Sequence, residues 1–437
     1  MSFLLLAASH TANVHPVMIA PFVILLLSIA VGPILFPHFW HKNYPKIAVG
    51  LGLITIFYYF FVLHNRDRLL HVGHEYLSFI ALIGALFVTA GGIHITVKGQ
   101  AKPLFNVAFL FFGAVIANLI GTTGASMVLI RPWLRMNRYR ITTFHIVFFI
   151  FIVSNVGGCL TPIGDPPLFL GYLKGIPFFW IIQQAWLPWL IAIVLLLAVF
   201  YVLDRRNFAK PPTEVTEAAT PADKWVFQGM HNIFFIALIL AAVLLNKILP
   251  TLVPEFIMLA AAFGSFKTTP DAIHEANHFD FEPIKEVAWL FVGIFATMIP
   301  ALDYLAVNAA DFSIDSPMKF YWFTGVLSAF IDNAPTYLTF LTTQMGLYGL
   351  DINLPADVLK NIATNYRDVV AISLGAVFFG AFSYIGNGPN LMVKAIADYA
   401  KVKTPSFFGY IFCYSVPFLL PILAIISILF FSPWKIF

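Results

Sequence analysis

The stretch SNVGGCLTPIGDPPLFLGYL, residues 154–173, interrupts one of the most apolar parts of the chain. It belongs to a long apolar segment, 141–172, but contains three glycines and three prolines between residues 157 and 167. Proline lacks the backbone N–H that a helix needs and glycine destabilises helix interiors, so we predict a broken helix around residues 161–167. Asp165 lies in the predicted break. In a bilayer, free backbone groups and a carboxylate are costly, and they are typical of functional sites.

The composition is that of a polytopic membrane protein. Of 437 residues, 60% are hydrophobic and 11% are charged, whereas soluble domains carry about 25% charged residues. The formal net charge of +4 is too small to predict nucleic-acid binding. Cys159 and Cys413 lie far apart in apolar segments, so they indicate neither a disulfide framework nor a metal site. We expect the lipid bilayer as the environment and no cofactor.

About ten apolar stretches are long enough to cross a bilayer as helices, which takes roughly 17–25 residues. They are 17–36, 46–63, 74–97, 141–172, 178–203, 231–249, the shorter 252–266, 285–303, 362–400 and 407–433. Two more apolar stretches, 102–134 and 317–348, are interrupted by the polar sequences GTTGAS (121–126) and IDNAPT (331–336). Each half is too short to cross alone, so we predict two re-entrant helical hairpins in an all-α protein.

One long polar insert divides the chain. We predict a first repeat at 1–203, a cytoplasmic linker at 204–230 and a second repeat at 231–437. Each repeat has five spans and one hairpin, and because five is odd, the second repeat enters the membrane from the opposite side. The expected fold is therefore an inverted repeat with two discontinuous helices, 141–172 and 362–400.

The basic residues predict the orientation. Loops that follow an odd number of spans hold sixteen Lys and Arg residues, and the other loops with the C-terminus hold eight. Basic residues are enriched in cytoplasmic loops, so we predict that the odd loops are cytoplasmic and both termini are outside. The expected location is the inner (plasma) membrane of a bacterium.

Each repeat pairs a polar hairpin tip with a broken helix. The polar residues are Thr122, Thr123, Ser126, Ser154, Asn155, Thr161 and Asp165 in the first repeat, and Asp332, Asn333, Thr336, Asn387, Asn390 and Lys394 in the second. We predict that they meet near the membrane midplane and bind an ion or substrate. Exposed helix N-termini favour an anion and C-termini a cation, so these residue types leave the sign of the substrate open.

The two acids are the predicted ion ligands. Asp165 and Asp332, one in each repeat, are the carboxylates that we place near the membrane centre. Two close carboxylates that cannot both stay charged hold a proton or a metal cation between them. The oxygen-rich neighbours suit sodium ion, which would then compete with protons.

Some of these residues have structural alternatives. Asp332 also fits the N-cap of the return helix of its hairpin. Asn118 and Ser154 fit hydrogen bonds between helices. Lys394 precedes Asp398 by four residues, and it fits either a salt bridge with that acid or a contact with Asp165, Asp332 or an anion.

Together the motifs resemble the ion transporter superfamily, which includes citrate and dicarboxylate carriers, arsenite pumps and NhaD-type sodium/proton antiporters. Nearly the whole chain carries the pattern of a polar tip, S-N-x-G-G with I-G-x-P-P, a second tip D-N-x-P, and I-G-N-G-P-N. The run GGCLTPIGD (157–165) with IDNAP (331–335) is most similar to the NhaD type. Thr161 in place of serine, and the pair Pro166–Pro167, depart from it; the proline pair is closer to the arsenite and citrate branches.

The resemblance implies ion binding by Asp165 and Asp332, and a mobile transport domain that slides against a scaffold in an elevator motion, commonly in a homodimer. We expect sodium/proton antiport first, because two acids would repel a tricarboxylate. The alternative is sodium- or proton-coupled transport of citrate or a dicarboxylate, which the neutral tip TTGAS, the proline pair and Lys394 favour; arsenite efflux is third. An enzyme is not expected, because no nucleophile–base pair or metal-binding trio lies at span depth.

Overall fold

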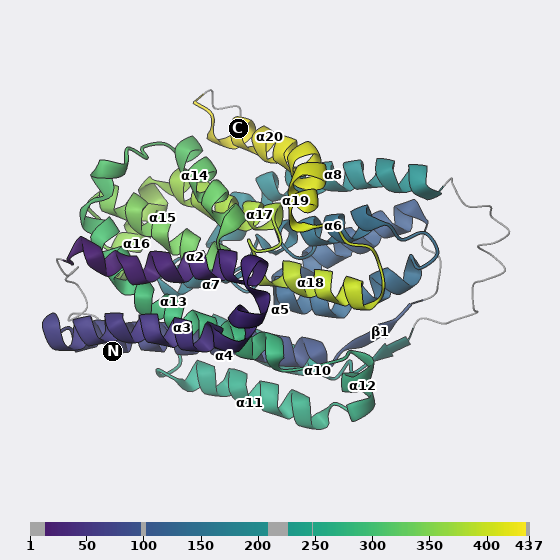
Figure 1. Cartoon of the computed structure of the whole chain (residues 1–437), viewed down its shortest axis with the longest axis horizontal. Helices are drawn as coiled ribbons and strands as arrows, with labels where there is room; N and C mark the ends of the chain where they lie inside the picture. Colours follow the sequence, from purple (N-terminus) through teal and green to yellow (C-terminus); the bar gives the residue numbers. More distant parts are fainter. Residues whose placement is uncertain (1–13, 98–101, 209–225, 247, 434–437) are drawn as a thin grey trace.

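A computed structural model describes residues 14–97, 102–208, 226–246 and 248–433. Their regular secondary structure is helical apart from one two-stranded ribbon (Figure 1). Among them, seven helices are long and apolar enough to cross a membrane, or eight if a bent pair counts as one span. The protein is thus an integral membrane protein built from helices.

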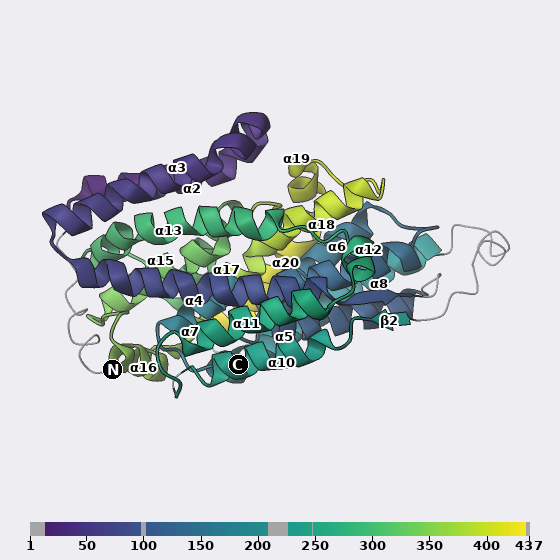
Figure 2. The same cartoon turned by 90° about the horizontal axis from the view of Figure 1, so that it is seen from below.

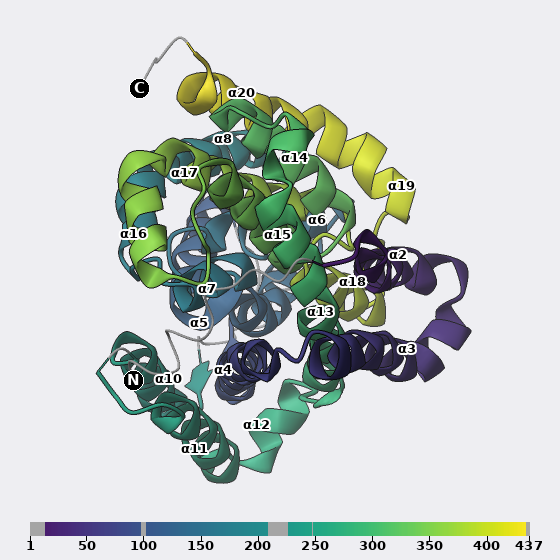
Figure 3. The ribbon, with the colours of Figure 1, turned by 90° about the vertical axis from the view of Figure 1, so that its left-hand side faces the viewer.

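The helices form two groups that lie side by side (Figures 2 and 3). The first group consists of α2 (Ala20–Leu35), α3 (Pro37–Phe57, continued by a π-helical turn Tyr58–Val62), α4 (Arg66–Gly91), α10 (Asn232–Leu244), α11 (Val253–Thr268), α12 (Asp271–Ala276) and α13 (Glu282–Val307). The second group consists of α5 (Pro103–Met136), α6 (Thr143–Ile152), α7 (Pro166–Leu173), α8 (Trp180–Phe208), α14 (Pro317–Phe330), α15 (Asn333–Leu347), α16 (Pro355–Thr364), α17 (Tyr366–Phe379), α18 (Gly388–Tyr399), α19 (Phe407–Tyr410, continued by the π-helical Ile411–Leu419) and α20 (Leu420–Phe431).

The element α5 is a helical hairpin, as predicted for 102–134. Gly121 has non-helical dihedral angles (φ 77°, ψ 156°) and reverses the chain. The two arms then lie against each other, since Asn106 Nδ2 donates to Asn137 Oδ1 at 2.8 Å. Further in, the rings of Phe109 and Trp133 stack at 5.7 Å between centroids. The longest apolar helix is therefore folded on itself.

The helices α14 and α15 contact each other across a short turn at Ile331–Asp332, where the sequence predicts the second hairpin tip. The predicted broken helices are also present. The first lacks α-helix between Ile152 and Pro166, and the second between Phe379 and Gly388. The first break begins earlier than residue 161, since α6 ends at Ile152. At Gly157 the backbone packs closely against α5, where a Cβ would lie 2.6 Å from the Ala114 backbone.

About ten spans are predicted beside the hairpins, whereas seven helices within the described residues, or eight with the bent pair, are long and apolar enough to cross a membrane. One of the seven is α5, which is the hairpin and not one of the predicted spans. Both discontinuous helices fall short because each is divided, and α10 and α11 have only 13 and 16 residues. The predicted span 362–400 begins inside α16, which meets the following helix at a bend of 97°. Charged and polar residues in α16 make it an amphipathic helix rather than part of a span.

Two boundaries also differ from the prediction. The span expected at 74–97 ends at Gly91, and His94–Thr96 forms strand β1, which pairs antiparallel with β2, Val226–Gln228. The linker expected at 204–230 begins later, because α8 continues to Phe208, and 209–225 lie outside the described residues.

Asp204, predicted to begin the solvated linker, is instead fully buried in α8. It pairs with Arg140, and it accepts hydrogen bonds from Asn106 Nδ2 at 2.8 Å and from His145 Nε2 at 3.1 Å. These contacts hold the ends of the α5 hairpin against α8. We call this end of the molecule, which carries β1 and β2, the ribbon end, and the opposite end the α16 end (Figure 1).

Candidate functional site

Asp165 is the residue on which the candidate site converges. It occupies the N-cap position of α7 and is only 1% exposed. Its Oδ1 accepts hydrogen bonds from Thr122 Oγ1 at 2.8 Å and Asn387 Nδ2 at 3.0 Å. Its Oδ2 accepts one from Asn333 Nδ2 at 2.6 Å. These three donors come from the α5 turn, the start of α18 and the start of α15, so one carboxylate joins both hairpin tips and both broken helices.

A second layer of polar side chains surrounds this centre. Asn155 Nδ2 donates to Asn390 Oδ1 at 2.7 Å, and Asn387 Nδ2 lies 3.1 Å from Asn155 Oδ1. The hydroxyls of Ser126 and Ser154 bond to each other at 2.7 Å. All five residues are buried. Buried polar groups of this kind are costly unless bonded, so the network holds its members in defined positions.

Asn333 retains one unused oxygen. Its Oδ1 is buried and has no hydrogen-bond partner among the described residues, while its Nδ2 donates to Asp165. Beside the carboxylate lies a cavity of about 30 Å³ whose lining includes Thr122, Thr123 and Pro166. One water molecule needs roughly 10–15 Å³ of such volume. Asp165 itself lines this cavity and Asn333 does not, so the space fits a small, water-sized occupant on one side of the carboxylate.

The first break is stabilised by α5. Thr161 Oγ1 donates to the Asn118 carbonyl at 2.6 Å, and Asn118 Nδ2 donates to the Gly157 carbonyl at 2.7 Å. Asn118 Oδ1 accepts from the Leu160 N–H at 2.8 Å. Asn118 therefore bonds between elements, as its structural alternative predicts, and it satisfies backbone groups that the broken helix leaves free. Thr161 lies within the break, and none of its hydrogen bonds described here involves the Asp165 side chain.

Asp332 and Lys394 make the contacts that their structural alternatives predict. Asp332 accepts the N–H of Ala334 at 3.0 Å and caps α15. Thr336 donates to the Asp332 carbonyl at 2.9 Å. Lys394 Nζ lies 2.5 Å from Asp398 Oδ2, one turn along α18. Among the described contacts, none of these side chains bonds to Asp165; their binding roles stay predictions.

The two breaks share one backbone arrangement. A Cβ on Gly164 would lie 2.1 Å from the carbonyl oxygen of Gly158, and a Cβ on Gly386 would lie 2.7 Å from that of Gly380. The spacing within each pair is the same, so each break closes on itself in the same way and requires glycine at the contact. Next in sequence come Asp165 and Asn387, both N-caps with extended backbone.

The hairpins repeat the same contacts. The Thr161 hydroxyl donates to a carbonyl near the end of the first α5 arm, and the Ser383 hydroxyl donates at 2.6 Å to the carbonyl of Ala329, near the end of α14. Thr122 and Asn333, one beyond each turn, both donate to Asp165. The two hairpins therefore approach the same carboxylate through equivalent positions.

A buried ionic cluster at the α16 end was not predicted. Arg68 Nη2 lies 2.9 Å from Asp303 Oδ1, and Lys174 Nζ lies 2.7 Å from Glu75 Oε1. Asn353 Oδ1 joins the two pairs, accepting from Arg68 at 2.6 Å and from Lys174 at 3.2 Å. These charges stand at the ends of apolar stretches and resemble ordinary loop charges in the sequence. The one signal for this cluster in the sequence was that both acidic and basic residues occur at the ends of these apolar stretches.

A comparison with curated proteins finds no match. Residues 11–431, nearly the whole chain, match the profile of a family described as "Putative citrate transport". This confirms the predicted ion transporter superfamily and the prediction that the chain is not an enzyme. The chain belongs to this citrate transport family of membrane transporters.

Proposed function

We propose that the protein is a secondary transporter that moves citrate or a related small carboxylate together with sodium ion or protons. The observation that carries the proposal is the convergence of donors from three discontinuous elements on Asp165. A ligand that neutralises this carboxylate alters all three contacts at once. The family match supports a carboxylate substrate and reverses the order expected from the sequence, in which sodium/proton antiport came first.

Asp165 is the proposed site of the coupling ion. Its carboxylate and the free Asn333 Oδ1 offer the oxygen ligands that hard cations prefer. The adjacent cavity of about 30 Å³ suits a small cation or a water molecule and is far too small for a tricarboxylate. Sodium ion and proton would compete for the same carboxylate. Asp332, at the neighbouring tip, remains the second predicted ion-binding acid.

Ion binding would prepare the site for an anion. When Asp165 is charged, it occupies the amides of Asn333 and Asn387. When a cation or proton neutralises it, those donors become available to a substrate carboxylate. The helices α7, α15 and α18 all begin at the site, and helix N-termini favour anions. The order is therefore cation first and carboxylate second.

The matched contacts of the two breaks support an inverted repeat with halves 1–203 and 231–437. In this arrangement the second helix group is the transport domain and the first is the scaffold, and the elevator motion slides one along the other. The cavity near Asp165 lies at this boundary, because Leu82 and Leu86 of α4 line it together with Thr122 of α5. A homodimer, which the superfamily resemblance implies, would hold the scaffold still.

Sodium/proton antiport without a carboxylate is the second candidate. The small size of the cavity beside Asp165 favours it, because an ion fits there without any movement of the helices. Arsenite efflux, the third function expected from the sequence, has no such observation in its favour.

Flux measurements in proteoliposomes distinguish the candidates. Vesicles with preset sodium and pH gradients receive labelled citrate, succinate or arsenite, and a pH dye follows proton movement. We expect accumulation of a carboxylate that depends on the cation gradient. A pH change on adding sodium, lithium or potassium ion that needs no carboxylate, with no carboxylate accumulation, would overturn the proposal in favour of antiport.

A further inference from the structure

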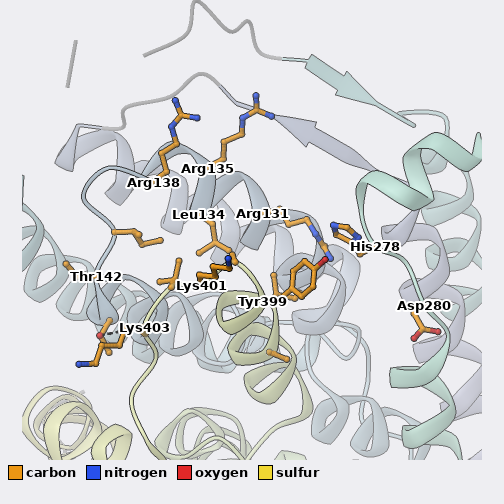
Figure 4. A pocket seen from close by; sticks show the side chains of 16 residues that line it. Arg131, Leu134, Arg135, Arg138, Thr142, His278, Asp280, Tyr399, Lys401 and Lys403 are labelled. Atoms are coloured by element: carbon orange, nitrogen blue, oxygen red, sulfur yellow. Dashed lines mark hydrogen bonds between the residues drawn. The ribbon is translucent and has the colours of Figure 1, made fainter. Parts of the chain in front are cut away.

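A large cavity of about 1240 Å³ lies at the ribbon end, between the second arm of α5 and the end of α18 (Figure 4). Its lining carries five cationic side chains, Arg131, Arg135, Arg138, Lys401 and Lys403. Asp280 is the one carboxylate among the described lining residues, and it stands apart from the arginines in the view of Figure 4. Such an excess of one charge in a concave site concentrates ions of the opposite sign.

Arg131 is the cation of this set nearest to the Asp165 site along α5. It is partly buried, and its one described polar contact is a 3.5 Å bond to the Met127 carbonyl. No described residue forms a salt bridge with Arg131, Lys401 or Lys403. The rings of His278 and Tyr399, 5.5 Å apart between centroids, line the cavity together with Arg131 (Figure 4). A guanidinium binds carboxylates through paired N–H donors.

The second arm of α5 lines both the large cavity and the small cavity beside Asp165. The second arm of α5 runs from Thr122, which donates to Asp165, to Arg131, a path of about 13 Å at 1.5 Å per residue. Thr123, Met127 and Arg131 follow at intervals of four residues, so they lie along one face of this arm. Thr123 lines the 30 Å³ cavity and Arg131 lines the large one.

Apolar side chains pack around Met127, which lies between Thr123 and Arg131 along the α5 arm. Met127 forms a small buried cluster with Phe87 and Val88 of α4, and Phe279 and Met392 pack against it. Phe87 also lines the 30 Å³ cavity. A hydrated anion in the large cavity would therefore have to displace these side chains to reach Asp165.

We infer that the large cavity is a capture site for multivalent carboxylate anions, with Arg131 as its innermost ligand and the Phe87–Met127 contact as its barrier. This inference rests on the proposed carboxylate transport and adds to it a second, peripheral binding site. Anionic lipid headgroups share the same charge chemistry, so the experiment separates them from a soluble carboxylate.

The test compares Arg131→Gln with Arg205→Gln, an exposed cation in the last turn of α8 that does not line the cavity. Initial rates of citrate transport from the ribbon-end side are measured against citrate concentration and ionic strength, in vesicles of neutral lipid and of neutral plus anionic lipid. In R131Q we expect the half-saturating concentration to rise about tenfold, the loss of one charge-assisted hydrogen bond. Its salt dependence should weaken, while transport from the other side stays unchanged. R131K should recover the salt dependence but only part of the affinity, because lysine keeps the charge and lacks the paired donors.

Each of the other possible outcomes overturns either the capture site or the proposed function. Equal half-saturation in R131Q and R205Q, with wild-type flux intact, overturns the capture site and leaves the proposed function standing. An effect that occurs only with anionic lipid assigns the cavity to headgroups and also overturns it. Absence of carboxylate flux in the wild-type protein overturns the proposed function itself.

The barrier has a separate readout that needs no transport. In a Cys413→Ser background, where the remaining Cys159 is buried, a charged thiol reagent is applied from the ribbon-end side to Arg131→Cys and Thr123→Cys. We expect fast labelling at position 131 and slow labelling at 123, accelerated by Met127→Ala. Equal labelling at both positions would contradict the barrier.

Discussion

Asp165 and Asn387 occupy the same place in two matching breaks, yet one is an acid and the other an amide. The pair lies 3.0 Å apart with the amide donating. A second carboxylate at Asn387 would face the first at hydrogen-bond distance, where one of the two would have to take up a proton. The amide therefore leaves the centre with a single carboxylate that three donors stabilise.

Asp165→Asn should abolish coupled transport while the protein still folds. The side chain keeps its shape but loses the charge that a cation binds and that three donors contact; at 1.5–3 kcal/mol for a hydrogen bond to a charged group, a rate loss of more than about 100-fold is expected. The measurement is cation-driven flux in proteoliposomes, with elution profile and thermal midpoint as controls for folding. Wild-type turnover in this variant would rule out Asp165 as the ion site.

Exchanging the two residues tests their equivalence. In the double variant Asp165→Asn/Asn387→Asp the carboxylate moves to the matching position and can still contact the amide beside it. We expect a flux at least about tenfold above that of D165N alone, since one acid–amide pair is restored. The single variant Asn387→Asp should instead transport poorly and recover at lower pH. Equal flux in D165N and the double variant would argue against equivalent positions.

The hairpin α5 depends on one glycine. Gly121 has φ 77° and ψ 156°, a region that is almost restricted to glycine. A Cβ there would also lie 3.3 Å from the Ile163 carbonyl. This contact is next to the bond from the Thr122 N–H to the Gly164 carbonyl at 2.8 Å. The turn thus places Thr122 against the break, and strain at the turn would be transmitted to Asp165.

Gly121→Ala should destabilise the protein by about 1–3 kcal/mol through the disallowed backbone conformation. The matched control is Gly50→Ala, in α3, where a Cβ meets no atom within 4 Å and alanine should stabilise the helix by about 0.5–1 kcal/mol. Thermal unfolding of the purified proteins followed by circular dichroism checks both. A thermal midpoint of G121A at or above that of the wild type would contradict the proposed turn geometry.

At the scale of the whole molecule, the buried ionic cluster joins the two helix groups at the α16 end. Glu75 belongs to α4 in the first group, whereas Lys174 directly follows α7 in the second. The large cavity lies at the opposite, ribbon end. The groups are therefore joined by buried ion pairs at one end, and a large cavity lies at the other.

Lys174→Met should destabilise the protein by about 3–5 kcal/mol, because it leaves the Glu75 carboxylate buried without its partner. The exposed pair Lys285–Glu282 is the control, where the same change should cost no more than about 1 kcal/mol. The double variant Lys174→Met/Glu75→Gln should recover much of the loss. Thermal midpoints measured side by side provide the comparison, and similar losses for K174M and K285M would mean that the cluster contributes little.

Much of the site was predictable because its signals are local. Glycines, prolines and polar residues within apolar segments predict where a membrane helix turns or breaks, since each acts on the backbone at its own position. The turn near residue 121, the breaks near 165 and 387, and the convergence of Thr122, Asn333 and Asn387 with Asp165 agree with those signals. The family match then corrected the order of the functions, which the acids alone had placed toward antiport.

Other features depended on contacts between distant residues. Asp204 lies buried rather than in a linker, because Arg140 pairs with it from 64 residues earlier in the chain. Strand β1 pairs with β2, about 130 residues later in the chain, and Lys174 finds Glu75 about 100 residues earlier. Local composition indicates which secondary structure a residue favours. It does not identify the partner of a charged side chain or of a strand, because that partner comes from a remote segment that folding brings close. The places where membrane helices turn or break were therefore predictable from the sequence, whereas the pairing of charges from distant segments required the folded molecule.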